Sequence, residues 1–119
     1  MNNIDKDTSK LINTIKNGIE EVKGNNIKIL DLRELYSSPT NFYIVCHGTS
    51  NTQVKAITES IIKFTEKELN ITPSHKEGLA QAEWVLLDYF NIIVHVFQEN
   101  QRFYYDIENL WADAEEIKN

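Results

Sequence analysis

The sequence predicts an α/β fold, with a mixed sheet and flanking helices. Apolar residues recur at three- and four-residue steps over 4–22 and again over 54–69, which is the spacing of helices with one buried side. Segments 42–46 and 84–97 are rich in apolar and aromatic residues, as buried strands are. Alternation of helical and strand segments favours helices layered against one sheet.

One domain is expected over residues 1–119, because a chain of 119 residues is too short for two independent cores. The chain carries 12 Lys and Arg against 18 Asp and Glu, a formal net charge of -6. Proteins that hold nucleic acid by its phosphates present a basic patch, so direct nucleic-acid binding is not expected. An acidic surface keeps a protein soluble, and it also suits a basic protein partner.

The single cysteine, Cys46, excludes a disulfide within the chain and favours a reducing compartment. No segment has the ~18 consecutive apolar residues of a membrane span, so no membrane association is expected. Segment 1–10 is polar and lacks the apolar stretch of a signal peptide. The expected location is therefore cytoplasmic.

Local signals predict the ends of the elements. Gly24 and Asn25 end the first helix, and Thr49 or Ser50 caps the second. The buried side of the second helix is expected to carry Val54, Ile57, Ile61, Phe64 and Leu69. The other elements are a half-buried strand over 27–32, a loop over 37–40, a turn over 47–50, a loop over 70–83 with a short edge strand near His75, and a closing helix that buries Ile107, Leu110, Trp111 and Ala114.

Strands 84–89 and 92–97 are predicted to form a hairpin, because only Phe90 and Asn91 connect them. The register pairs, on a core-facing side, Tyr89 with Ile92, Leu87 with Val94 and Val85 with Val96. On the other side it pairs Asp88 with Ile93, Leu86 with His95 and Trp84 with Phe97. That second face mixes charge, imidazole and aromatic rings. Trp84 therefore fits a core position and an exposed interface anchor equally well.

Catalysis by the available thiol and imidazoles is not expected. Cys46 lies in an apolar strand, where cysteine behaves as a small hydrophobic residue, and His47 points to the opposite face. Close Cys or His pairs of the kind that bind zinc are absent from the sequence. Strand 42–46, followed by Gly48-Thr49-Ser50 and a helix, is similar to the start of a nucleotidyltransferase, but such enzymes use paired carboxylates to hold metal. The next strand carries only Asp88, so neither metal nor cofactor is expected.

Two further groups have structural and functional interpretations. Arg102 is predicted to form a surface ion-pair cluster with Glu99, Asp106 and Glu108. Glu77 and Gly78 precede Trp84 in a loop, where a glycine by itself indicates only a turn.

Several motifs stand in order along the chain. W-V-L-L-D-Y begins at Trp84, V-H-V-F ends at Phe97, and R-F-Y-Y-D-I-E-N-L-W runs over 102–111. Upstream, F-Y-I-V over 42–45 is followed by G-T-S over 48–50 and Q-V over 53–54. Glu77-Gly78 forms an E-G loop. Together these motifs resemble the ribosomal silencing factor family, also called RsfS or Iojap-like, across nearly the whole chain.

The resemblance implies a protein that binds the large ribosomal subunit through its fourteenth ribosomal protein, blocks subunit joining and represses translation when nutrients are limiting. It implies a nucleotidyltransferase-like sheet without catalytic carboxylates, no reaction and no cofactor, and it allows a homodimer. The expected partner-binding residues are Trp84, Glu77, Gly78, Asp88, His95, Phe97, Arg102 and Tyr105. Alternatives are a subunit assembly factor that uses the same surface and a nucleotide-binding, nucleotidyltransferase-like domain.

The hairpin connection departs from the family, which commonly has Gly-Asp where this chain has Phe90-Asn91. A Phe is strained at positive φ, so we expect Asn91 to adopt that conformation or the turn to be longer.

Overall fold

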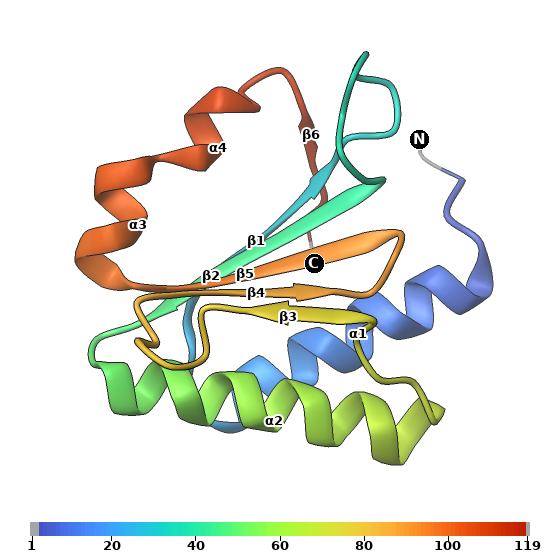
Figure 1. The fold of residues 1–119 in the computed structure, drawn as a ribbon. Helices are drawn as coiled ribbons and strands as arrows, with labels where there is room; N and C mark the ends of the chain where they lie inside the picture. Colours follow the sequence, from blue (N-terminus) through green and yellow to red (C-terminus); the bar gives the residue numbers. More distant parts are fainter. Residues whose placement is uncertain (1–2, 119) are drawn as a thin grey trace.

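A six-stranded sheet with the order β3-β4-β5-β2-β1-β6 forms the centre of the computed structural model, which describes residues 3–118 (Figure 1). Residues 1, 2 and 119 of the predicted domain lie outside that range. The strands are β1 Asn25–Asp31, β2 Phe42–Gly48, β3 His75–Glu77, β4 Trp84–Asp88, β5 Ile92–Gln98 and β6 Glu115–Glu116. Strands β2 and β5 are parallel and the other neighbours are antiparallel. The predicted fold class, a mixed sheet with flanking helices, is confirmed.

Two long helices, α1 Lys6–Glu21 and α2 Asn51–Leu69, cover one face of the sheet (Figure 1). Each begins at a side chain that caps a free backbone amide: Asp5 accepts from Thr8, and Ser50 accepts from Gln53. Of the two predicted caps for the second helix, Ser50 is therefore the one used. Asn70, in the left-handed conformation, ends α2.

The main hydrophobic core lies between these helices and the sheet. All six predicted core residues of the hairpin are buried there: Val85, Leu87, Tyr89, Ile92, Val94 and Val96. In α2, Val54, Ile57 and Ile61 are buried as predicted, but Phe64 and Leu69 are only half-buried. Thr65 takes the inward position instead, where its hydroxyl oxygen lies 2.9 Å from the Tyr89 hydroxyl.

Strand β2 is longer than predicted, because His47 and Gly48 continue its pairing with β5 instead of starting a turn. All seven of its residues are buried, as expected for a strand covered on both faces. Cys46 faces the main core, and burial raises the pKa of its thiol to about 12. The thiol is therefore protonated at neutral pH.

The hairpin register of β4 and β5 matches the prediction at the five pairs from Trp84–Phe97 to Asp88–Ile93, and the Tyr89 amide donates to the Ile92 carbonyl at 2.8 Å, but the turn differs from the prediction. Phe90 itself adopts positive φ, at 79°, and the Asn91 amide donates to the Tyr89 carbonyl at 3.0 Å in a γ-turn. Two contacts hold this conformation. The Phe90 amide donates to Asp88 Oδ1 at 2.7 Å, and the Asn91 side chain donates to Thr8 Oγ1 at 3.0 Å.

The predicted closing helix is divided into α3 Glu99–Tyr105, α4 Ile107–Leu110 and strand β6. Asp106, at φ 48°, separates the two helices. Ile107 is buried and Trp111 packs half-buried on the sheet, but Leu110 is 76% exposed, so its predicted core position is wrong. Figure 1 shows α3 and α4 on the opposite side of the sheet from α1 and α2.

None of the helices within residues 3–118 combines the length and the hydropathy that crossing a membrane requires.

Candidate partner-binding site

Trp84 stands at the start of β4, on the face of the sheet near α3. Its indole nitrogen donates a hydrogen bond to His95 Nδ1 at 3.0 Å. Its ring stacks on Phe97, with centroids 4.8 Å apart, and contacts the Tyr105 ring of α3 at 4.7 Å. We call Trp84, His95, Phe97 and Tyr105 the aromatic cluster. Trp84 is half-buried and Tyr105 is 47% exposed, so these two members reach the surface.

Phe97 and His95 lie beneath Trp84 and not beside it on the surface. Phe97 has no exposed area and His95 only 4%, because Trp84, Tyr43 and the C-terminal segment cover this part of the sheet. Half-buried Trp84 therefore lies between the two predicted positions, whereas Phe97 occupies a core position. In this structure Phe97 and His95 orient the indole of Trp84 from below.

The Trp84 contact determines the tautomer of His95. Because Nδ1 accepts from the indole, the neutral ring carries its proton on Nε2. That buried nitrogen has no hydrogen-bond partner, and the Tyr43 ring lies edge-on to the imidazole with centroids 4.4 Å apart. Burial lowers the pKa of His95 to about 4. A neutral imidazole is thus required to keep Trp84 in place.

Gly78 has a definite structural reason to be glycine. Its φ is +82°, and a Cβ at this position would lie 2.0 Å from the Trp84 carbonyl oxygen. The loop after β3 can pass this close to Trp84 only without a side chain. Glu77, at the end of β3, is exposed and hydrogen-bonded to His75 at 2.5 Å.

A pocket of about 220 Å³ opens beside Trp84 and Tyr105. Gly78, Gln81, Glu83 and Gln101 complete its lining. We call this the Trp84 pocket. Of its residues, the sequence did not predict Gln81, Glu83 or Gln101, because only the fold brings the loop before β4 against α3.

Asp88 does not belong to this group. It lies at the other end of β4, four residues and about 13 Å along the strand from Trp84. Its carboxylate accepts from the Phe90 amide and supports the hairpin turn.

Arg102 is buried, at 2% exposure, so the predicted surface ion-pair cluster is wrong in its main member. Its guanidinium makes a bidentate contact to Glu108, with both N···O distances at 3.0 Å, and donates to the Asn26 carbonyl and to His47 Nδ1, both at 2.8 Å. We call Arg102, His47, Glu108 and the Asn26 carbonyl the Arg102 cluster. The guanidinium is the main cause that lowers the pKa of the Glu108 carboxyl. Burial first, and then the Arg102 charge, lower the pKa of His47.

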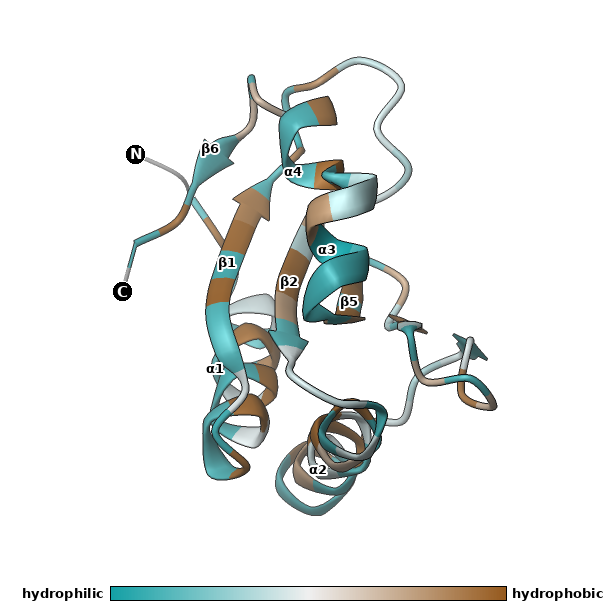
Figure 2. Cartoon of the chain, turned by 90° about the vertical axis from the view of Figure 1, so that its left-hand side faces the viewer, coloured by the Kyte–Doolittle hydropathy of each residue, from teal (hydrophilic) through white to brown (hydrophobic). Residues whose placement is uncertain are grey.

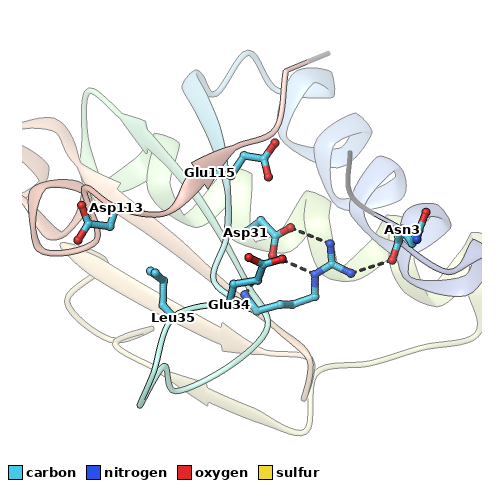
Figure 3. Close-up of a pocket in the computed structure, with 7 residues that line it drawn as sticks. Asn3, Asp31, Glu34, Leu35, Asp113 and Glu115 are labelled. Atoms are coloured by element: carbon cyan, nitrogen blue, oxygen red, sulfur yellow. Dashed lines mark hydrogen bonds and ion pairs between the residues drawn. The ribbon is translucent and has the colours of Figure 1, made fainter.

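A larger pocket of about 550 Å³ lies at the far side of the sheet, by β1 and β6 (Figure 3). Its carboxylates come from Asp31, Glu34, Asp113 and Glu115. Arg33 already pairs with Asp31 in two hydrogen bonds of 2.8 and 3.0 Å and lowers the pKa of that carboxyl. Two strands, β5 and β2, lie between β4 and β1 in the sheet order, so this pocket is remote from Trp84. Across residues 3–118, no three His, Cys, Asp or Glu side chains are grouped so that they could hold a metal ion.

Comparison with known proteins agrees with the motifs around the aromatic cluster. A family model described as "Ribosomal silencing factor during starvation" matches residues 5–119. The chain belongs to the ribosomal silencing factor family. The match covers the aromatic cluster, the Trp84 pocket and the Arg102 cluster.

Relatives in this family align over most of the chain. "Ribosomal silencing factor RsfS" of Halalkalibacterium halodurans is 33% identical over 109 residues, which is 92% of each chain. The Bacillus subtilis protein of the same name is 37% identical over 95 residues, 80% of this chain and 79% of its own. "Protein Iojap, chloroplastic" of Zea mays is 31% identical over 82% of this chain and 42% of its own length.

Solved structures show the same fold. A crystal structure of a Bacillus halodurans protein gives a TM-score of 0.80 at 30% identity, over 93% of this chain and 99% of that one. A crystal structure of a Chromobacterium violaceum protein gives 0.81 at 36% identity, over 87% and 85%.

Proposed function

We propose that this protein binds the large ribosomal subunit through its fourteenth ribosomal protein, blocks joining of the small subunit and so represses translation under nutrient limitation. Family membership supports the ribosomal silencing role. The fold supports a contact-based mechanism, because Gly78, Trp84 and Tyr105, which come from three of the motifs, line one surface pocket.

The observation that carries the proposal is the environment of Trp84. An aromatic ring that is fixed from below by His95 and Phe97, and still half-exposed, loses little conformational freedom on binding. Rigid Trp and Tyr side chains are the residues that most often anchor protein interfaces. The Trp84 pocket beside it offers a recess for a partner side chain.

Charge supports a basic partner surface. Glu83 lines the Trp84 pocket and Glu77 is exposed at the end of the neighbouring strand, in a chain with a net charge of -6. Complementary charge accelerates encounter and is screened by salt. Association with the large subunit should therefore slow as the salt concentration rises.

The proposed mechanism involves no chemical step. Asp88 is the only carboxylate on β4, and it supports the hairpin turn. Among residues 3–118, Glu83 is the single carboxylate that lines the Trp84 pocket, and the imidazole that contacts Trp84 is buried and neutral, so the pocket lacks a paired-carboxylate site.

Sedimentation of the purified protein with separated ribosomal subunits tests the proposal, followed by a subunit-joining assay. We expect the protein to pellet with large subunits only and to lower the yield of joined ribosomes in proportion to its occupancy. Binding without any effect on joining would contradict silencing and favour the assembly role on the same surface. Absence of binding, with micromolar binding of a nucleoside triphosphate and magnesium by calorimetry, would favour the nucleotide-binding alternative.

A further inference from the structure

Helix α3 has almost no apolar anchorage. It is seven residues long, its N-terminus has no side-chain cap, and Arg102 is its only buried residue. Phe103 and Tyr104 are 68% and 78% exposed, and Figure 2 shows α3 mostly in the hydrophilic colour. A helix this short does not form by itself in water, so its place on the sheet depends on tertiary contacts.

Arg102 makes the side-chain hydrogen bonds that join α3 to other elements. Its four hydrogen bonds reach β1 at Asn26, β2 at His47 and α4 at Glu108. Three separate segments thus converge on one guanidinium. Its planar fork fixes orientation as well as distance, which a lysine ammonium cannot do.

We infer that Arg102 is a positioning residue for partner binding: by fixing α3 on the sheet, it places Tyr105 against Trp84 and forms the Trp84 pocket. This inference rests on the proposed function. Arg102 itself is 2% exposed and lies outside the pocket lining, so it acts through Tyr105 and Gln101, which are on the same helix. Without the Arg102 cluster, α3 detaches for part of the time and the pocket loses one wall.

His47 makes this arrangement sensitive to acid. Its Nδ1 accepts from Arg102, so protonation of Nδ1 replaces an acceptor with a donor and places a positive charge 2.8 Å from the guanidinium. Glu99 of α3, with a carboxylate oxygen 3.6 Å from Nε2, and Glu108 of α4 oppose this effect, and Lys28 of β1 pairs with Glu108 at 3.8 Å. Burial and Arg102 lower the pKa of His47 in the docked state. Between the ordinary value of 6.5 and the lowered pKa of the docked state, falling pH therefore favours detached α3, because that state binds the proton first.

The test uses Arg102→Lys, with His47→Asn as the matched control. Asparagine keeps an acceptor for Arg102 near the position of Nδ1 but does not titrate. Trp84 exposure is followed by acrylamide quenching in a Trp111→Phe background, which leaves Trp84 as the only tryptophan of the two in the chain. Binding rates are measured on immobilised large subunits, and circular dichroism confirms that each variant is folded.

We expect Arg102→Lys to increase quenching of Trp84 and to lower the association rate by about tenfold, with the dissociation rate nearly unchanged. A surface that is formed for only a tenth of the time weakens apparent affinity by about tenfold. From about pH 7.5 to about pH 5.5 the parent should show rising quenching, and His47→Asn should show much less.

Unchanged quenching in folded Arg102→Lys would overturn the inference, and so would a binding loss confined to the dissociation rate. Equal pH dependence in the parent and in His47→Asn would also contradict it, since His47 would then not control α3. If the parent does not bind large subunits, the proposed function fails, but the quenching of Trp84 still tests whether Arg102 places Tyr105.

Discussion

On one face of the sheet, aliphatic side chains from α1 and α2 fill the main core, whereas on the other face aromatic rings and a buried arginine cover the strands. The helix-covered face holds Ile15, Ile19, Ile57 and Ile61, none of which has exposed area. The aromatic face holds His95 with an unpartnered nitrogen, and Trp84 that is only half-buried.

The helix-covered face mainly stabilises the fold, and the aromatic face mainly positions the residues that we propose bind the partner. Burial of apolar surface on the helix-covered face gives most of the folding free energy. The aromatic face relies on directional contacts, which specify positions more than they add stability. Substitutions on the two faces should therefore have different consequences.

The largest loss of stability is expected on the helix-covered face. Ile57→Ala leaves a cavity between α2 and the sheet, at a site with no exposed area, and should lower the free energy of unfolding by about 2–5 kcal/mol. Urea unfolding measures the loss. Leu110→Ala is the control, because a side chain that is 76% exposed should change stability by less than about 0.5 kcal/mol. Equal losses at the two positions would contradict the assignment of the core.

The aromatic face should lose stability in acid. The pKa of His95 is about 4 in the folded protein and 6.5 ordinarily, so the unfolded chain binds the proton first as pH falls. Stability contributed by neutral His95 is complete above pH 6.5 and is lost at up to about 1.4 kcal/mol per pH unit between 6.5 and 4.

Urea unfolding at several pH values measures this slope in the parent and in His95→Leu. The variant is expected to be less stable at neutral pH, because the Trp84 indole loses its acceptor, but to have a shallower slope. Equal slopes of unfolding free energy against pH in the parent and the variant would show that a lowered pKa of His95 does not cause the loss.

A smaller loss is expected at the rim of the Trp84 pocket. Gly78→Ala forces a side chain into a positive-φ position and against the Trp84 carbonyl, and should lower stability by about 1–3 kcal/mol. Thermal unfolding gives the loss, and tryptophan emission reports the displaced ring. A variant as stable as the parent, with unchanged emission, would show that the loop at Gly78 can move to accommodate a side chain.

The smallest effect should be a gain, at the hairpin turn. Phe90 is 88% exposed and adopts φ 79°, so Phe90→Gly removes backbone strain without loss of buried surface. Relief of strain exceeds the added chain entropy, and stability should rise by about 0.5–1 kcal/mol. Thermal unfolding gives the change. A melting temperature well below that of the parent would contradict the γ-turn at Phe90.

Sequence patterns predicted the hairpin register and the helix-covered core, because the two-residue strand period and the helical period directly report which side chains face inward. They did not predict the burial of Phe97 and His95. That burial depends on Trp84, Tyr43 and the C-terminal segment, which only the fold brings together. The sequence of α3 also contradicts the usual rule, because its charged Arg102 is buried while Phe103 and Tyr104 are exposed.

Two other predictions, the burial of Leu110 and the conformation of the Phe90-Asn91 turn, are wrong for a related reason. Leu110 has helical spacing to Ile107. However, α4 is only four residues long and ends at Leu110, so the spacing does not place this side chain in the core. The Phe90 turn depends on contacts from Asp88 and Thr8, and Thr8 lies 83 residues from its partner Asn91 in sequence. Local patterns contain no information on such distant contacts.

Sedimentation of folded Trp84→Ala with purified large ribosomal subunits tests the central claim most directly, since Trp84 is the proposed anchor. Removal of a central interface tryptophan should weaken binding by about thirtyfold or more. Phe90→Ala, a change of an exposed aromatic residue at the opposite end of the hairpin, should bind as the parent does. Parent-like binding by folded Trp84→Ala would contradict the claim that this surface recognises the ribosome.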